Sequence, residues 1–264
     1  MSHDALVETQ YGKVRGTHLG PISVWKGIPY AQPPIGKLRF HIPQAPEAWS
    51  GVRDATAFSA MAPQDVVNLS GLAEALGATA TGGEQAPVSE DCLYLNIWSP
   101  QADEKKRPVM VWIHGGAFVV GSSSQPDYNG ASFAQQGDVV VVTLNYRLGV
   151  LGFLQLGDLA GEEYASAGNL GLLDQIAALK WVRDNIAAFG GDPHNVTIFG
   201  ESAGAMSIGT LLAMPATKGL FQKAILESGA AHNVQDKAHA TKTAHEWLEI
   251  LGLGTHETAA LTDL

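Results

Sequence analysis

Short apolar runs recur along the chain and alternate with segments of helical periodicity. The strand-like runs cover residues 6–16, 22–30, 93–98, 109–113, 139–144, 196–199 and 224–226. The later runs are continuously apolar, which is typical of parallel strands covered on both faces. The first two are joined by the turn residues Gly20 and Pro21, so they predict an antiparallel edge.

Helices are predicted between the later strands. The clearest spans 171–189 and ends at Gly190, with one apolar stripe formed by Leu172, Ile176, Leu179, Val182 and Ile186. A second helix is expected after Ser202, and a third over about 236–251. This alternation predicts an α/β fold with a doubly wound, mostly parallel sheet and antiparallel edge strands at the N-terminus.

In two segments near the N-terminus, the apolar residues show neither the spacing of a helix nor that of a strand. Residues 31–60 are rich in proline and are expected to lie as coil over the surface. Residues 61–88 are rich in Ala, Gly and Thr, which favours a surface loop with a short helix near 66–76. The alternative interpretation of this second segment is a mobile lid beside an active site.

Composition narrows the class of protein. The 264 residues are 45% hydrophobic and 16% charged, enough for one large α/β domain or two small ones. The net charge of −10 disfavours nucleic acid or anionic lipid as a partner. No apolar run reaches membrane length, no secretory signal is visible, and the single cysteine, Cys92, excludes an internal disulfide. We therefore expect a cytoplasmic protein without a membrane segment, and its oligomeric state stays open.

The candidate chemistry begins at residues 200–204, Gly-Glu-Ser-Ala-Gly, which fit the G-x-S-x-G nucleophile elbow. Alone the pattern is weak, but here it lies between a β-branched run and a small-residue helix, as an elbow requires. Such a turn exposes a serine hydroxyl and holds the backbone in a strained conformation. The pattern predicts Ser202 as the catalytic nucleophile.

A second motif, His114-Gly115-Gly116, directly follows the strand at 109–113. Its glycine N–H groups, with that of Ala203 after the nucleophile, would form an oxyanion hole for a tetrahedral intermediate. The plainer alternative is a glycine turn at a strand end. His114 is expected to be structural, because the catalytic histidine of this arrangement follows the serine in chain order.

Together these motifs resemble the type-B carboxylesterase family, which includes the cholinesterases. Further stretches that carry the resemblance are W-K-G-I-P-Y-A at 25–31, E-D-C-L-Y-L-N at 90–96, N-Y-R-L-G at 145–149, G-N-L-G-L-L-D-Q at 168–175 and F-G-G-D-P at 189–193. The resemblance implies an α/β-hydrolase fold and an acyl-enzyme mechanism on small-molecule carboxylic esters. It implies no cofactor and no metal.

The resemblance also implies roles for individual side chains. Ion pairs Arg39–Glu90 and Arg147–Asp174 would brace loops around the site. Cys92 matches a position that is disulfide-bonded in secreted relatives, and its missing partner agrees with a reducing compartment. Glu201 is expected beside the nucleophile. Ser228 is expected either to hydrogen-bond within the triad network or merely to cap the strand before it.

The resemblance also bears on the extent of the domain. Family members are about twice as long, and the triad acid and histidine follow the serine in chain order. Residues 1–264 are therefore expected to be the N-terminal part of a single α/β-hydrolase domain, incomplete at its C-terminus, with both residues beyond Leu264. A newly started helix is expected over 255–264. The substitute base within the chain would be His232.

Other functions remain as alternatives. A catalytically silent, cholinesterase-like interaction module is one, and an inactive truncated product is another. Nucleotide binding is disfavoured because neither G-x-G-x-x-G nor the P-loop motif occurs. A zinc hydrolase is disfavoured because His239, His245 and His256 lack the H-E-x-x-H spacing.

Overall fold

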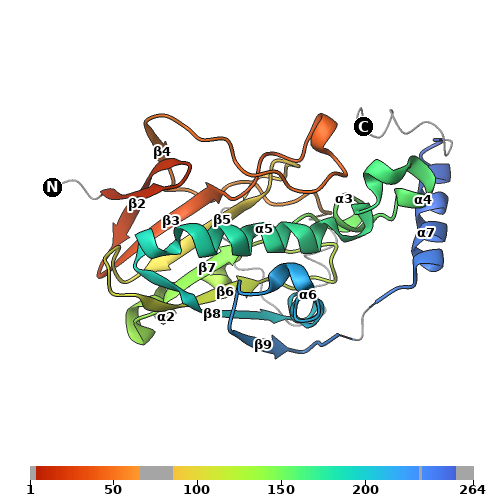
Figure 1. Ribbon diagram of the computed structural model, residues 1–264. Coiled ribbons are helices and arrows are strands. Elements are labelled where there is room, and N and C mark those ends of the chain that lie inside the picture. The colour runs from red at the N-terminus through yellow and green to blue at the C-terminus, as the bar shows by residue number, and fades with distance from the viewer. Residues whose placement is uncertain (1–3, 66–85, 232–233, 254–264) are drawn as a thin grey trace.

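The computed structural model describes residues 4–65, 86–231 and 234–253 (Figure 1). Within these ranges nine strands form one sheet. Its order is β1 (Asp4–Thr9), β2 (Gly12–Leu19), β3 (Ile22–Pro29), β5 (Tyr94–Ser99), β7 (Val140–Leu144), β6 (Arg107–Ile113), β8 (Gly191–Glu201) and β9 (Lys223–Glu227), with β4 (Val52–Asp54) beside β2.

The sheet has an antiparallel half and a parallel half. Strands β1, β2, β3, β5 and β7 pair with one another antiparallel, and β7, β6, β8 and β9 pair parallel. The predicted antiparallel N-terminal edge and the later parallel strands are therefore confirmed. Because parallel strands place their carboxyl ends at one edge, the ends of β6 and β8 lie side by side there, with Ile113 opposite Gly200.

Helices cover both faces of the sheet. Successive side chains of a strand point to opposite faces, and β7 shows this directly. Val140 and Val142 belong to the cluster that contains Leu179 of α5 (Leu170–Asn185), whereas Val141 packs with Ala134 of α2 (Ala131–Gly137). Helix α6 (Ala203–Leu211) contacts β6, β8 and β9, and in Figure 1 it lies on the same side of the sheet as α5. The doubly wound arrangement is confirmed.

A smaller apolar cluster lies beside the main core. It joins α4 (Gly157–Ala160) and its neighbours to α7 (Lys237–Ile250), whose Ala244 and Leu248 are buried there. Helix α7 begins at its N-cap Asp236, which accepts a hydrogen bond from the His239 N–H at 2.9 Å. The remaining short helices are α3 (Gly149–Phe153), η1 (Gly36–Leu38), η2 (Pro126–Tyr128), η3 (Glu162–Tyr164), η4 (Ala167–Asn169), η5 (Ile186–Phe189) and η6 (Pro215–Thr217).

The structure corrects one element of the sequence prediction and adds others. The run at 6–16 is not one strand, because Thr9 Oγ1 donates to the Gly12 carbonyl and Gly12 takes a φ of +140°, which turns β1 back into β2. Strand β4 and helices α2, α3 and α4 were not predicted, since elements of three to seven residues are too short to show a period. The helices predicted near 66–76 and over 255–264 lie outside the described residues.

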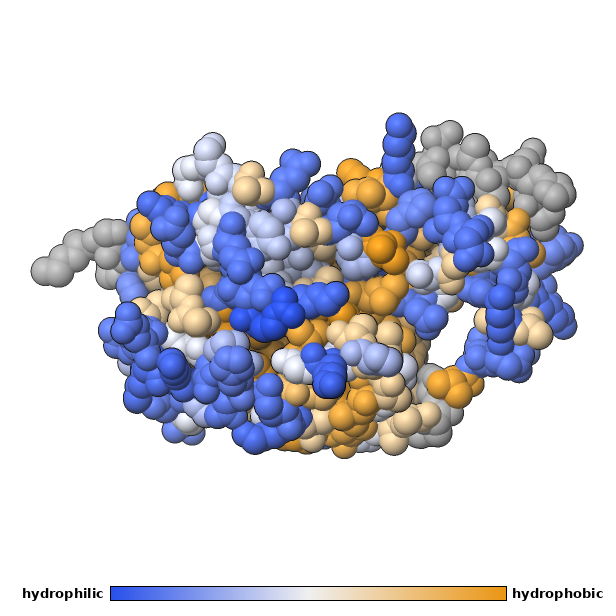
Figure 2. Space-filling model, in the orientation of Figure 1, coloured by the Kyte–Doolittle hydropathy of each residue, from blue (hydrophilic) through white to orange (hydrophobic). Residues whose placement is uncertain are grey.

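The parallel half ends in an exposed strand. Figure 2 shows apolar residues gathered over the side of the molecule where α6 and β9 lie. There Ile225 on β9 is 43% exposed, and Leu212, directly after α6, is 56% exposed. In the described part of the chain, no helix is long and apolar enough to cross a membrane.

Candidate active site

Ser202 lies in a sharp turn between the end of β8 and the start of α6. Its backbone has φ 52° and ψ −119°, a conformation that is unfavourable for a residue with a side chain. Hydrogen bonds on both sides hold it there. The Ser202 N–H donates to the Glu227 carbonyl of β9, and the Ser202 carbonyl accepts from the Met206 N–H, each at 2.9 Å. The turn therefore has the strand–turn–helix form that the elbow motif predicts.

The two glycines of the elbow are required by the close approach of β6. A Cβ on Gly204 would lie 2.0 Å from the Ile113 carbonyl oxygen, and one on Gly200 would lie 2.5 Å from the same atom. A side chain at either position would push α6 away from the sheet. The glycine spacing of the motif thus has a steric cause in this fold.

The glycine loop after β6 lies against the elbow. A Cβ on Gly115 would be 2.8 Å from the Glu201 carbonyl oxygen and 3.3 Å from the Ser202 Cβ. Gly116 has a φ of +108°, and a Cβ there would be 2.1 Å from the Val120 carbonyl oxygen. The sequence motifs at 114–116 and 200–204 are therefore brought together at the carboxyl edge of the sheet.

Three backbone N–H groups at this junction have no acceptor among the residues that the structure describes. They belong to Gly115, Gly116 and Ala203. Ala203 opens α6, where the first N–H groups of a helix have no intrahelical partner. Because buried N–H groups are normally paired, unpaired donors beside a serine hydroxyl are suited to binding an oxygen atom that carries negative charge.

His114 is buried behind the glycine loop, with 1% of its surface exposed. Its Nδ1 lies 2.8 Å from the Gly115 carbonyl oxygen, so Nδ1 carries the proton and donates it. The ring stacks on Tyr146 at a centroid distance of 4.4 Å, and the Tyr146 hydroxyl donates to the His114 carbonyl at 2.8 Å. Burial lowers the pKa of His114 to about 4. A buried, neutral imidazole with these bonds fits the expected structural role.

The other end of the loop is held by a side-chain amide. Gln64 accepts from the Gly121 N–H at 2.8 Å and donates to the Gly121 carbonyl at 2.9 Å. Gly121 has a φ of +115°, and a Cβ there would lie 2.5 Å from His114 Nδ1. Neither Gln64 nor Tyr146 was singled out from the sequence. Tyr146 lies in the 145–149 stretch that carries the family resemblance, which was the available signal.

Glu201 and Ser228 flank the elbow, and their predicted supporting roles stay predictions. The Glu201 carboxylate lies beside the glycine loop, where its Oε2 would be 2.8 Å from a Cβ on Gly115. Burial raises the pKa of Tyr128 to about 12, and the nearby Glu201 carboxylate contributes. Ser228 is exposed, with a φ of 55°, and follows the Glu227 whose carbonyl holds the Ser202 N–H.

A partner for the Ser202 hydroxyl is not found in the described ranges, where it makes no hydrogen bond to a histidine or a carboxylate. The substitute base considered from the sequence, His232, lies outside those ranges. No group of three or more His, Cys, Asp or Glu side chains in the described chain is placed to hold a metal ion.

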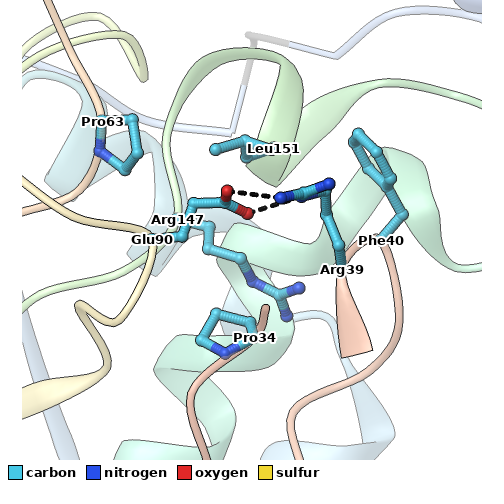
Figure 3. Close-up of a pocket in the computed structure, with 7 residues that line it drawn as sticks. All are labelled: Pro34, Arg39, Phe40, Pro63, Glu90, Arg147 and Leu151. Atoms are coloured by element: carbon cyan, nitrogen blue, oxygen red, sulfur yellow. Dashed lines mark hydrogen bonds and ion pairs between the residues drawn. The ribbon is translucent and has the colours of Figure 1, made fainter. Parts of the chain in front are cut away.

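Both ion pairs implied by the resemblance are confirmed. Arg39 donates two hydrogen bonds of 2.7 Å to the Glu90 carboxylate, and Figure 3 shows the two groups facing each other beside Arg147. Arg147 binds Asp174 through Nε at 2.8 Å and Nη2 at 2.7 Å, and Asp174 is fully buried. The first pair holds loop 31–60 against the segment before β5, and the second holds the segment after β7 against α5.

A cavity of about 260 Å³ lies elsewhere, between α3 and α7. Its lining residues are Arg39, Phe40, Glu90, Val150, Leu151, Leu154, Trp247, Leu248 and Leu251. None of them belongs to the elbow or to the glycine loop. The cavity is therefore separate from the Ser202 junction.

Comparison with known protein families shows the family to which this chain belongs. The sequence model of the carboxylesterase family matches residues 3–264. The chain belongs to the carboxylesterase family. Among its relatives, the para-nitrobenzyl esterase of Bacillus subtilis (strain 168) is 55% identical over 255 residues, which are 96% of this chain and 49% of that protein. Liver carboxylesterase 1 of Oryctolagus cuniculus is 50% identical over 86% of this chain and 40% of its own length.

Solved carboxylesterase structures confirm the α/β-hydrolase fold. The Geobacillus stearothermophilus carboxylesterase at pH 6.2 has a TM-score of 0.89 and 52% identity, over 98% of this chain and 50% of that one. A para-nitrobenzyl esterase structure gives a TM-score of 0.90 at 52% identity, over all of this chain and 51% of that one. The chain thus spans about half the length of the carboxylesterases that it matches.

Proposed function

We propose that the whole protein is a serine hydrolase of small-molecule carboxylic esters, with Ser202 as its nucleophile. One observation carries the proposal: Ser202 is held at positive φ in the elbow, next to three backbone N–H groups that lack acceptors. The names of the relatives, a para-nitrobenzyl esterase and a liver carboxylesterase, support the substrate class.

In the proposed mechanism, Ser202 Oγ attacks the ester carbonyl carbon while a general base takes its proton. The carbonyl oxygen becomes an oxyanion, to which the N–H groups of Gly115, Gly116 and Ala203 donate. Collapse of this intermediate releases the alcohol, which receives the proton, and leaves the acyl group on Ser202. Water, activated by the same base, then releases the carboxylic acid and restores the serine.

The base and the acid that orients it are proposed to come from outside the described residues. Relatives are about twice the length of this chain, and in this fold both partners follow the serine. We therefore propose that residues 1–264 form the N-terminal part of a single α/β-hydrolase domain, which supplies the nucleophile and the oxyanion hole. Hydrolysis by residues 1–264 alone should then be slower by on the order of 10⁶, as in triad-knockout comparisons.

A fluorophosphonate probe tests the nucleophile in the whole protein. Ser202 should be labelled, and Ser202→Ala should prevent labelling. Ser207→Ala is the matched control, because Ser207 lies on the same helix but is buried against Gln175, and this variant should still be labelled. Equal labelling of Ser202→Ala would contradict the assignment. A folded whole protein that is never labelled would favour the silent interaction module.

A further inference from the structure

We propose that His114 and Tyr146 are positioning residues, which aim the N–H groups of Gly115 and Gly116 at the oxyanion. The inference rests on the proposed function and adds to it two side chains that touch neither the substrate nor Ser202. They act through the peptide planes of the glycine loop.

The argument begins with the geometry of the peptide bond. No peptide in the described chain is cis, so each carbonyl and the N–H of the next residue point in opposite directions across one plane. Fixing the Gly115 carbonyl therefore fixes the direction of the Gly116 N–H. In the same way, fixing the His114 carbonyl fixes the direction of the Gly115 N–H.

Both carbonyls are held on the buried side of the loop. The His114 carbonyl accepts from the Tyr146 hydroxyl at 2.8 Å, and the Gly115 carbonyl accepts from His114 Nδ1 at 2.8 Å. The two side chains stack on each other, so neither can turn without displacing its neighbour. The corresponding N–H groups point away from this pair and have no acceptor in the described ranges.

The state of the histidine ring supports a specific use of Nδ1. His114 Nε2 is buried and has no hydrogen-bond partner among the described residues, which is unusual for a buried polar atom. An apolar ring could stack on Tyr146 equally well, and it would not bury an unpaired nitrogen. Such a ring would, however, lack the Nδ1–H group that donates to the Gly115 carbonyl. Gly121 leaves room for the bond, since a Cβ there would lie 2.6 Å from the Gly115 carbonyl oxygen.

Three variants of the whole protein test the proposal. Tyr146→Phe keeps the stack and removes the hydroxyl, and His114→Phe keeps a ring and removes the Nδ1 donor. His114→Asn is the rescue variant, because its amide N–H reaches the position of Nδ1. Tyr94→Phe is the matched control: it removes another tyrosine hydroxyl, which donates to the Asp91 carboxylate at 2.7 Å and not to a carbonyl of the glycine loop or of the residue next to Tyr146.

Rates are normalised to the number of active serines, counted by phosphonate titration, so that loss of folded protein does not lower them. Removing a whole oxyanion donor costs 10²–10³ in kcat, so misaiming one should cost on the order of 10–100-fold, with KM little changed. Tyr146→Phe and His114→Phe should show this loss. His114→Asn should recover most of it, and Tyr94→Phe should keep the wild-type kcat.

A trifluoromethyl ketone, which forms an oxyanion on the serine, supplies a second measurement. Its inhibition constant should rise in parallel with the loss of kcat/KM in Tyr146→Phe and His114→Phe, because both report on the same N–H groups. Wild-type kcat and inhibition constant in both variants would overturn the positioning role. Failure of the proposed function is distinguishable, because then either the wild type would hydrolyse no ester or Ser202→Ala would remain active.

Discussion

Acid should destabilise this protein through one buried imidazole. Burial lowers the pKa of His114 from 6.5 to about 4, with a smaller opposing effect from the hydrogen bond to the Gly115 carbonyl. The unfolded chain therefore binds more protons than the folded protein between these two values, and the free energy of unfolding falls as the pH falls through this window.

The size of the effect follows from the two pKa values. At 1.36 kcal/mol per pKa unit, the full difference between them corresponds to about 3 kcal/mol, lost by the time the pH reaches 4. Between pH 7.5 and pH 5 the loss should be about 2 kcal/mol. Removing the imidazole should abolish that part of the pH dependence, whatever the absolute stability of the variant.

The assay is urea unfolding at pH 7.5 and pH 5, for the wild type and for His114→Asn. Other groups also titrate between these values. The informative quantity is therefore how much more free energy of unfolding the wild type loses on acidification than His114→Asn does. We expect the wild type to lose about 2 kcal/mol more than His114→Asn. His194→Asn, which removes an exposed imidazole, is the control and should behave as the wild type. An equal loss in the wild type and in His114→Asn would refute the reasoning.

Three further predictions concern the framework of the site. Arg147→Met should cost about 3–5 kcal/mol in urea unfolding, because it leaves the buried Asp174 carboxylate unpaired, and replacing both residues by apolar ones should recover most of this. Gly204→Ala should cost at least about 3 kcal/mol, since its Cβ meets a carbonyl of β6, whereas Gly20→Ala, with open space around it, should cost only about 1–2 kcal/mol of backbone strain. Cys92, whose pKa is raised by complete burial, should react with Ellman's reagent only after unfolding.

The features predicted well from the sequence are those in which a steric requirement leaves a residue pattern. Gly200 and Gly204 are required by the approach of Ile113, and this requirement appears as a motif. The stripe over 171–189 likewise reflects burial of α5 and η5 against the sheet.

The features missed from the sequence depend on contacts between distant segments or on very short elements. The pairing of His114 with Tyr146 exists because β6 and β7 end side by side, which no local pattern records. The turn that divides 6–16 depends on two hydrogen bonds of the Thr9 hydroxyl, one to the Gly12 carbonyl and one from the Tyr11 N–H, and the pattern of apolar residues does not record them. Strand β4 has three residues, too few to distinguish from coil.

The order of strands in the sheet has a consequence for synthesis of the chain. Strand β6 pairs with β7 on one side and with β8 on the other, but β6 ends at Ile113 and β8 only at Glu201. At about 5–20 residues per second, a ribosome needs on the order of 5–20 s to cover that interval. During this time the apolar edge of β6 can pair with other nascent chains, because an unpaired strand edge is a template for aggregation. Slower translation between β6 and β8 should therefore lower the yield of soluble protein, and a chaperone that shields β6 should restore it.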